Sequence, residues 1–198
     1  MEALIAAARD PAFPAEIVLV LSNRPDAVGL DTARAAGIRA EAIDHNAFGR
    51  DRAAHETAID AVLRAAGIEI VCLAGYMRLL TPVLVNAWVG RMLNIHPSLL
   101  PSFPGLNTHA HALEAGVKLH GCTVHLVTLE VDSGPILAQA AVPVLPNDTE
   151  EALAARVLRQ EHALYSAALA AFAAGVPAPL PVPGAFLANP LPWHGSVE

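Results

Sequence analysis

The sequence predicts an α/β protein built on a mostly parallel sheet with helices on both faces. Two patterns and the chain length carry this prediction. Short apolar runs rich in Val, Ile and Leu alternate with amphipathic segments, as expected for strands connected by helices. Glycines follow several of the amphipathic segments, where helices commonly end. Residues 1–198 suit one domain of ordinary size, with no internal repeat and no linker.

The first strands and the helix between them are predicted in the N-terminal quarter. EIVLVLSNR (16–24) is an apolar run ended by polar residues and Pro25, which is typical of a buried strand. A helix over 26–38 ends near Gly37, because glycine readily leaves the helical conformation. IRAEAID (38–44) is the second predicted strand.

The middle of the chain continues the alternation. The helix predicted over 51–67 has Gly67 at its end and apolar residues at helical spacing. These residues are Ala54, Ala58, Ile59, Val62 and Leu63. A strongly apolar strand, IEIVCLAG (68–75), follows. Pro82 occupies the first turn of the next helix, over 81–90, where proline is well tolerated.

The pattern changes in the C-terminal half. We expect a strand over 91–97 and a helix over 108–116. Two further strands, over 121–130 and 135–144, follow one another directly. The residues VDSG between them are a turn signal, so these two strands are not separated by a helix.

A long helix over 148–175 closes the predicted core. Asp148 or Thr149 serves as its N-cap, and acidic residues in its first turn suit the helix dipole. Residues 176–198 are rich in proline and are expected to run irregularly over the surface. The single domain therefore consists of a core over 1–175 and this tail.

Composition argues against several classes of function. The formal net charge is −7, Lys118 is the one lysine, and no cluster of Lys and Arg offers a nucleic-acid surface. No apolar run reaches the roughly 18–20 residues of a membrane span, and the start has no signal-peptide pattern. We expect a cytoplasmic protein that binds neither nucleic acid nor membrane. The sequence does not fix an oligomeric state.

The two cysteines, Cys72 and Cys122, both lie inside predicted strands. Buried thiols commonly act as small apolar side chains. Neither cysteine has the spacing to histidine or cysteine that is typical of a zinc site. We therefore expect no metal.

A polar pair, Asn94 and His96, interrupts an apolar strand near its carboxyl end. The two residues are two apart, so their side chains point to the same face. Ligands of such sheets bind beyond the carboxyl ends of the strands. Three prolines within the next eight residues restrict the loop that follows. An amide can polarise a carbonyl while an imidazole moves a proton, but a hydrogen-bonded core histidine is the alternative for His96.

Two acidic residues are further candidates. Asp132 lies in a predicted turn, where it either caps the backbone or orients His96 and keeps it protonated. Glu161 and His162 lie within the long helix, where they form a charged face or supply a carboxylate for a substrate amine. Spacing alone leaves both choices open.

These motifs resemble one family closely. NIHPSLLPSFPGLNTHAHAL is similar, almost residue for residue, to the signature of the phosphoribosylglycinamide formyltransferases. Supporting segments agree in order and spacing over about residues 1–175: LSNRPDAVGLDTARAAGI, VCLAGYMRLLTP, HGCTVHLVTLEVDSGPILAQAAVPV and ARVLRQEHALY. The resemblance implies a Rossmann-like formyltransferase fold and an enzyme of purine biosynthesis.

The resemblance also implies a mechanism. The amine of glycinamide ribonucleotide attacks the formyl carbon of 10-formyltetrahydrofolate, the co-substrate, through a tetrahedral intermediate and without a metal. His96 is then the general acid and base, Asn94 holds the formyl oxygen as it becomes negative, and Asp132 keeps His96 protonated.

Binding residues follow from the same motif match. The implied folate-binding residues are Arg52, Met77, Arg78, Leu79, Leu80, Asn94, Thr128, Leu129, Glu130, Val131 and Asp132. The implied residues for glycinamide ribonucleotide are Leu158, Arg159, Gln160 and Glu161. The family more often has polar, uncharged residues at the positions of Leu158 and Arg159. We therefore expect these two residues to contact the substrate through their backbone groups.

The start of the chain departs from the family. Members open with an apolar strand and a Gly-rich loop that binds the substrate phosphate. This chain begins MEALIAAARD, which has the pattern of the helix after that loop. We therefore expect the first strand to be missing between the strands that match 16–21 and 69–73, which leaves two sheet edges unpaired. We expect the natural protein to extend upstream by a strand and a loop. A true truncation without the phosphate site is the alternative.

Other functions remain open at this point. A folate-binding paralogue with impaired or no catalysis would fit the missing phosphate loop. Formyltetrahydrofolate hydrolase and methionyl-tRNA formyltransferase share the Asn-x-His…Asp core. The hydrolase typically has a second histidine where this chain has Pro97, and an additional N-terminal domain. The tRNA enzyme carries a basic C-terminal domain.

Overall fold

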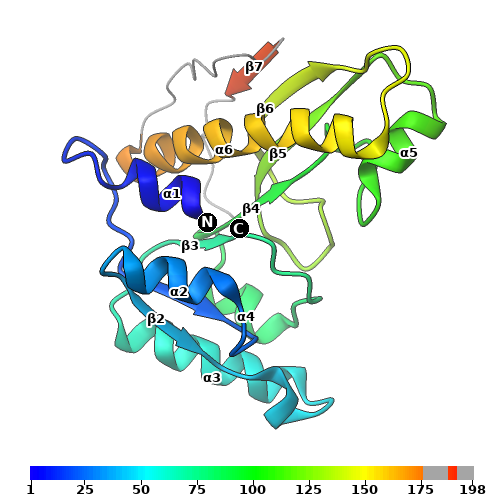
Figure 1. Cartoon of the computed structure of the whole chain (residues 1–198). Coiled ribbons are helices and arrows are strands. Elements are labelled where there is room, and N and C mark those ends of the chain that lie inside the picture. The colour runs from blue at the N-terminus through cyan, green and yellow to red at the C-terminus, as the bar shows by residue number, and fades with distance from the viewer. Residues whose placement is uncertain (176–186, 191–198) are drawn as a thin grey trace.

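The computed structural model describes residues 1–175 and the backbone of 187–190. The helices are α1 (Glu2–Ala7), α2 (Val28–Ala35), the 3₁₀ helix η1 (His45–Phe48), α3 (Arg52–Ala65), α4 (Pro82–Ala87), α5 (Thr108–Glu114) and α6 (Glu150–Ala174). The strands are β1 (Leu19–Ser22), β2 (Arg39–Ala42), β3 (Val71–Leu73), β4 (Met92–His96), β5 (Leu119–Leu126), β6 (Ile136–Pro143) and β7 (Leu187–Pro190). Figure 1 shows the long helix α6 running across the larger sheet, with α1 beside it.

The strands form two sheets. β1 and β2 pair in parallel, and the second sheet has the order β3-β4-β5-β6-β7. β3 and β4 are parallel, whereas β4, β5, β6 and β7 pair antiparallel in succession. The predicted α/β class is confirmed, but the pairing is mixed and antiparallel in the C-terminal half. β5 and β6 follow one another without a helix, and a parallel pair needs a longer crossover.

Most predicted elements lie where the sequence places them, with shorter strands. Thr149 is the N-cap of α6, and its side chain accepts a hydrogen bond from Ala152 N at 3.2 Å. Pro82 is the first residue of α4, after the N-cap Thr81. Gly67 follows α3 with φ 68°, the left-handed conformation that glycine adopts without strain. The short helix η1 was not predicted, since one turn leaves no periodic pattern.

The prediction of an irregular tail is wrong at one segment. β7 pairs antiparallel with β6 through Ala138↔Pro190 to Ala141↔Leu187. Pairing with an edge uses backbone groups, so it leaves little trace in side-chain pattern. The rest of the predicted tail, 176–186 and 191–198, lies outside the described residues.

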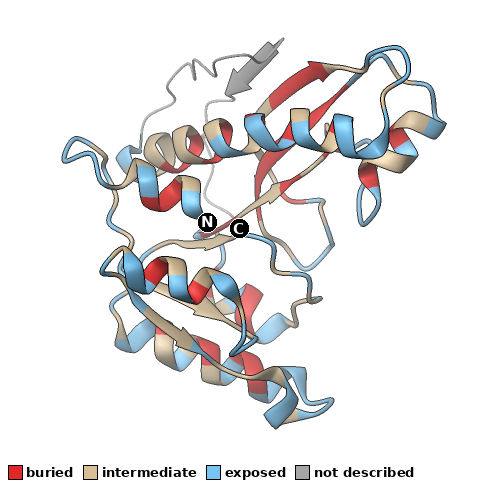
Figure 2. Cartoon of the chain, in the orientation of Figure 1, coloured by how far each residue is buried: buried red, intermediate tan, exposed pale blue. Residues whose placement is uncertain are grey.

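The main core lies between the larger sheet and α6. Cys122, Val124 and Leu126 alternate along β5 and are buried among apolar side chains of α6. Figure 2 shows this buried stripe on β5 and β6, and the buried side of α6. Both cysteines are free, as expected. Because successive side chains of a strand point to opposite faces, Thr123 and His125 lie on the other face of the sheet.

A second, smaller core joins α3 and α4 to the sheet. Its buried members are Ile59, Leu63, Leu84, Trp88 and Met92. Trp88 is 1% exposed, and its indole Nε1 donates a hydrogen bond to Asp60 Oδ1 at 2.9 Å. Its one polar atom is therefore satisfied inside the core.

An open slot separates the two sheets. A cavity of about 680 Å³ lies between β1 and β3, and residues of α1, α3, α4 and α6 also line it. Among the residues that the structure describes, no strand pairs with the edges of β1 and β3 that line this cavity. The two facing edges are therefore unpaired within the described residues, as expected.

Tyr165 connects α6 to both parallel strands of the larger sheet. Its hydroxyl lies 2.9 Å from the carbonyl oxygen of Leu73 on β3 and 3.0 Å from that of Leu93 on β4. Tyr165 is 4% exposed, so water does not replace these bonds easily. The hydroxyl thus fixes α6 against the strand that carries Asn94 and His96.

We predict that Tyr165→Phe lowers the free energy of unfolding by about 1–3 kcal/mol, because it leaves buried carbonyl oxygens without this partner. Urea unfolding followed by far-UV circular dichroism measures the change. Tyr76→Phe, at the chain's other tyrosine, is the matched control and should cost less, since Tyr76 is only half-buried. Equal losses in the two variants would contradict the role given to Tyr165.

Candidate active site

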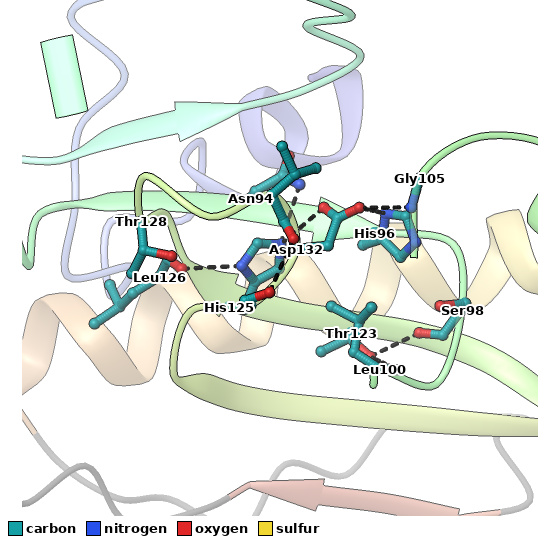
Figure 3. A network of polar contacts seen from close by, with 12 residues as sticks. Asn94, His96, Ser98, Leu100, Gly105, Thr123, His125, Leu126, Thr128 and Asp132 are labelled. Atoms are coloured by element: carbon teal, nitrogen blue, oxygen red, sulfur yellow. Dashed lines mark hydrogen bonds and ion pairs between the residues drawn. The ribbon is translucent and has the colours of Figure 1, made fainter. Parts of the chain in front are cut away.

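The polar pair predicted from the sequence lies on β4, on the face opposite α6. Cross-strand register places Asn94 opposite His125 and His96 opposite Thr123 on β5. Residues directly opposite in an antiparallel pair share a face. Figure 3 shows these side chains grouped above the sheet with Asp132. β4 and β5 therefore present an amide and two imidazoles to one small region.

Asp132 reaches this region from the loop between β5 and β6. The loop turns so closely that a Cβ on Gly134 would lie 1.8 Å from the carbonyl oxygen of Leu126, which requires glycine there. Asp132 itself has φ 53°, an uncommon conformation for a residue with a side chain. Its carboxylate Oδ2 accepts a hydrogen bond from Gly105 N at 2.8 Å. Asp132 thus joins two loops over the sheet.

His96 has an acceptor at each ring nitrogen. Its Nε2 lies 3.0 Å from the carbonyl oxygen of Phe103, and its Nδ1 lies 3.4 Å from Asp132 Oδ2. The His96 side chain is 6% exposed and that of Asp132 is 9% exposed. Because a carbonyl and a carboxylate both accept, the imidazolium form, with two N–H donors, satisfies both contacts. Both ring nitrogens of His96 therefore face an acceptor.

His125 holds the amide of Asn94. Its Nδ1 lies 2.9 Å from the carbonyl oxygen of Leu126 and so carries the hydrogen. Its Nε2 lies 3.2 Å from Asn94 Nδ2 and accepts from it. Burial lowers the pKa of His125, which favours this neutral ring. Asn94 keeps a second N–H, which can be donated to a substrate oxygen.

His125 is a site residue that the sequence does not indicate. HGCTVH (120–125) predicts a strand only, and the partner of its last residue depends on the register between β4 and β5. That register is not visible in the sequence. The alternation of the strand, which places His125 on the face away from the core, is the signal that could have indicated it.

The predicted folate-binding residues lie in two local groups. Arg52 Nη1 on α3 donates to the carbonyl oxygen of Leu79 at 3.3 Å, which joins α3 to the run Met77, Arg78, Leu79, Leu80. In the loop after β5, Thr128 Oγ1 donates to the carbonyl oxygen of Glu130 at 3.0 Å. Hydrogen bonds of the described residues do not connect the two groups directly.

Both groups present apolar side chains to the outside. Met77 is 75% exposed and Leu79 is 60% exposed. Leu129 and Val131 are also more than half exposed. Exposed apolar side chains of this size are typical of ligand-binding surfaces. The two groups are therefore candidates to offer a ligand both apolar side chains and backbone polar groups.

A buried carboxylate anchors the first group. Glu56 is 2% exposed and accepts hydrogen bonds from Thr81 N at 2.7 Å, Thr81 Oγ1 at 2.6 Å and Leu84 N at 3.2 Å. These donors form the N-terminus of α4, where a negative charge is favourable. Glu56 therefore fixes the end of the segment that begins with Met77. No sequence pattern marks Glu56, because it lies within an ordinary amphipathic helix.

The predicted substrate-binding residues lie on α6. Leu158 and Arg159 are exposed, whereas Gln160 is 4% exposed and its Oε1 accepts no hydrogen bond from the described residues. Burial raises the pKa of Glu161, which is half-buried. No hydrogen bond or ion pair of the described residues joins these four residues to Asn94, His96 and Asp132.

A second pair of histidines lies behind the loop that follows β4. His109 Nδ1 on α5 lies 3.1 Å from His120 Nε2 on β5, and Phe103 packs edge-on against His120. His120 is 1% exposed. Burial lowers the pKa of His120 to about 4, with smaller contributions from His109 and His96. This pair stays neutral near pH 7.

Over residues 1–175 and the backbone of 187–190, no three His, Cys, Asp or Glu residues are grouped to hold a metal ion. Within the same residues, no helix is both long enough and apolar enough to cross a membrane.

Comparison with known proteins places this chain in one family. The family described as formyl transferase matches residues 1–169. Phosphoribosylglycinamide formyltransferase of Escherichia coli (strain K12) is 43% identical over 175 residues, which are 88% of this chain and 82% of that protein. The trifunctional purine biosynthetic protein adenosine-3 of Homo sapiens is 49% identical over 175 residues, 88% of this chain. The chain spans 17% of the length of that relative.

Solved structures agree. The phosphoribosylglycinamide formyltransferase from Brucella melitensis is 60% identical, with a TM-score of 0.84 over 89% of this chain and 90% of that chain. Glycinamide ribonucleotide transformylase 1 from Symbiobacterium toebii is 49% identical, with a TM-score of 0.85 over 88% of this chain and 82% of that chain. The similarity therefore extends over the sheet, the loops and the long helix.

We predict that the buried His120 makes the chain less stable as pH falls from about 6.5 to about 4. Its folded-state pKa of about 4 lies below the value of about 6.5 expected in the unfolded chain. Between these values the unfolded state binds more protons, so the free energy of unfolding decreases as pH falls and levels off below about pH 4. Urea unfolding at several pH values measures this slope.

His120→Gln removes the titrating ring and should flatten the slope in this window. His111→Gln, at an exposed histidine of α5, is the matched control and should leave the slope unchanged. The same slope in His120→Gln and in the unchanged chain would contradict the assignment to His120.

Proposed function

Because the chain belongs to the formyl transferase family, we propose that it transfers the formyl group of 10-formyltetrahydrofolate to the amine of 5-phosphoribosylglycinamide. This is a reaction of de novo purine biosynthesis. The names of relatives at 43% and 60% identity support phosphoribosylglycinamide as the formyl acceptor, and the resemblance described above implies the folate donor. The observation that carries the proposal is the His96 ring, held between the Phe103 carbonyl and Asp132 beside Asn94.

The proposed reaction is a direct transfer. The lone pair of the substrate amine forms a bond to the formyl carbon, and the carbonyl π electrons move to the formyl oxygen. The free N–H of the Asn94 amide, whose Nδ2 is already held by His125, donates to this oxyanion. The C–N bond to N10 of the folate then breaks as the carbonyl re-forms.

His96 manages the protons of this transfer. N10 must gain a proton to leave as tetrahydrofolate, and the attacking amine must lose one, so the protons balance within the site. His96 supplies the proton as an imidazolium and regains one as the base. The Asp132 carboxylate faces Nδ1 and stabilises the imidazolium through charge.

Binding of the folate is assigned to the two exposed groups. The proposed contacts are Arg52, Met77, Arg78, Leu79, Leu80, Asn94, Thr128, Leu129, Glu130, Val131 and Asp132. Glycinamide ribonucleotide is assigned to Leu158, Arg159, Gln160 and Glu161. Burial raises the pKa of Glu161, but as a carboxylate it would still attract the substrate amine. We propose that these residues form one domain over 1–198, and that the reduced folate is a co-substrate in a reaction without a metal.

The alternatives predict different outcomes. A folate-binding paralogue would bind folate without forming formylated product. A formyltetrahydrofolate hydrolase would release formate without an amine acceptor, and a methionyl-tRNA formyltransferase would require a charged tRNA. The relatives' names favour the purine reaction over each of these. Assaying one preparation with and without glycinamide ribonucleotide separates them.

We predict that Asp132→Asn lowers turnover by about 10²- to 10⁴-fold, the range for losing general acid–base catalysis. The amide retains the shape of the carboxylate but removes the charge that stabilises the His96 imidazolium. His96→Ala should lower turnover at least as much. Formation of tetrahydrofolate under saturating substrates measures turnover.

Folate binding is the control for both variants. A folate analogue should bind the variants within a few-fold of the unchanged chain, as measured by isothermal titration calorimetry. Full activity in a well-folded Asp132→Asn variant would overturn the role given to Asp132. Folate binding without any transfer by the unchanged chain would favour the paralogue.

A further inference from the structure

Three side chains form a row across the strands of the larger sheet. His96 on β4 is opposite Thr123 on β5, and Thr123 is opposite Gln139 on β6. Opposite residues in antiparallel pairs share a face, so all three project from the same side of the sheet. The row links the proposed proton carrier to a residue two strands away. Neither the motif nor the proposed mechanism uses Gln139.

Gln139 donates both hydrogens of its amide. Its Nε2 lies 2.8 Å from the carbonyl oxygen of Leu100 and 3.0 Å from Thr123 Oγ1. A carbonyl oxygen can only accept, which fixes the orientation of the amide with its nitrogen toward the loop. The loop that follows His96 is therefore hydrogen-bonded from below by a side chain of β6.

Thr123 completes the connection. Its hydroxyl donates to the carbonyl oxygen of Ser98 at 2.7 Å and accepts from Leu100 N at 3.0 Å, in addition to Gln139 (Figure 3). A hydroxyl has one donor and two acceptor positions, and all three are used. Ser98, Leu100 and Thr123 are 0%, 4% and 0% exposed, so water does not substitute for these bonds. The three contacts therefore depend on one another.

The loop leads back to the His96 ring. Ser98 Oγ donates to the carbonyl oxygen of Ser102 at 2.6 Å, and the next residue, Phe103, offers its carbonyl oxygen to His96 Nε2 at 3.0 Å. The path from Gln139 through Thr123 and Ser98 to Phe103 therefore ends on the nitrogen opposite Asp132. A shift of the loop would move the Phe103 carbonyl and let the ring rotate.

We propose that Gln139 is a positioning residue for His96. By holding the loop over 97–103, its amide keeps the Phe103 carbonyl on His96 Nε2 and so keeps Nδ1 directed at Asp132. The consequence for catalysis rests on the proposed function. The consequence for the orientation of the ring does not, because it is a property of the folded chain alone.

The principal test is Gln139→Met, which has nearly the same shape but no donors. We expect kcat to fall by about 10- to 100-fold, because small displacements of a catalytic group cost this much. The KM values for folate and for the amine substrate should change little, since Gln139 touches neither proposed binding group. We also expect the ¹⁵N chemical shifts of the His96 ring to change, as its hydrogen bond to Phe103 weakens.

Thr123 provides a second pair of variants if Gln139→Met folds poorly. Thr123→Val removes the hydroxyl and should reproduce the loss of kcat and the change in the His96 shifts. Thr123→Ser keeps the hydroxyl, so its kcat and its His96 shifts should stay close to those of the unchanged chain. This rescue separates positioning from general packing, since both substitutions alter the side-chain volume.

Arg156→Met is a matched control for lost stability. Arg156 also donates to the backbone of β6, at the Pro143 carbonyl oxygen at 2.9 Å, but at the end away from His96. It should lower the melting temperature without changing kcat or the His96 shifts.

A folded Gln139→Met with unchanged kcat and unchanged His96 shifts would overturn the proposal. A lower melting temperature with unchanged kcat and shifts would also overturn it, since the role would then be structural. If the unchanged chain transfers no formyl group, the proposed function fails. The His96 shifts in the same variants would still decide whether Gln139 positions the ring.

Discussion

The need to satisfy both nitrogens of a buried histidine determines the local structure of the site. His96 is 5% exposed, and an unsatisfied buried N–H costs about 1–3 kcal/mol. One acceptor comes from the loop after β4, at Phe103, and the other from the loop after β5, at Asp132. Gly105 N donates to Asp132 and joins the two loops to each other. Neither loop can move without leaving the imidazolium short of a partner.

The three buried histidines of β4 and β5 differ because their surroundings differ. Burial without a close anion lowers the pKa of His120, and burial also lowers that of His125 although Asp132 opposes it. A neutral His125 can accept from Asn94, which a charged ring could not do. Asp132 lies closer to His96, at 3.4 Å from Nδ1, than to His125, at 3.7 Å from Nε2, and the His125 Nε2 also faces the Asn94 amide at 3.2 Å. The same residue type thus serves as acceptor for Asn94 at one position and as the proposed proton carrier at the other, according to its hydrogen-bond partners.

The sequence predicted those parts of the site that depend on local pattern. Asn94 and His96 followed from their spacing of two at a strand end, and the helix ends followed from Gly67, Thr149 and Pro82. Asp132 could be assigned only through resemblance, because a turn aspartate has a common local role. His125, Thr123 and Gln139 were missed because their partners depend on register across three strands. The VDSG turn predicted two strands without a helix between them. It did not by itself predict the mixed sheet, although so short a connection permits only antiparallel pairing of β5 and β6.

The proposed chemistry depends on the larger sheet and not on the slot between the sheets. Asn94, His96 and Asp132 are held by β4, β5 and the loops beside them, and none of the three lines the cavity between β1 and β3. Gly75 and Tyr76, which lead into the first folate group, do line it. Filling or leaving open that slot should therefore act on substrate binding, through KM, before it acts on proton transfer. We expect kcat to depend instead on the hydrogen bonds of β4, β5, β6 and the loops beside them, because these orient the proposed reacting groups.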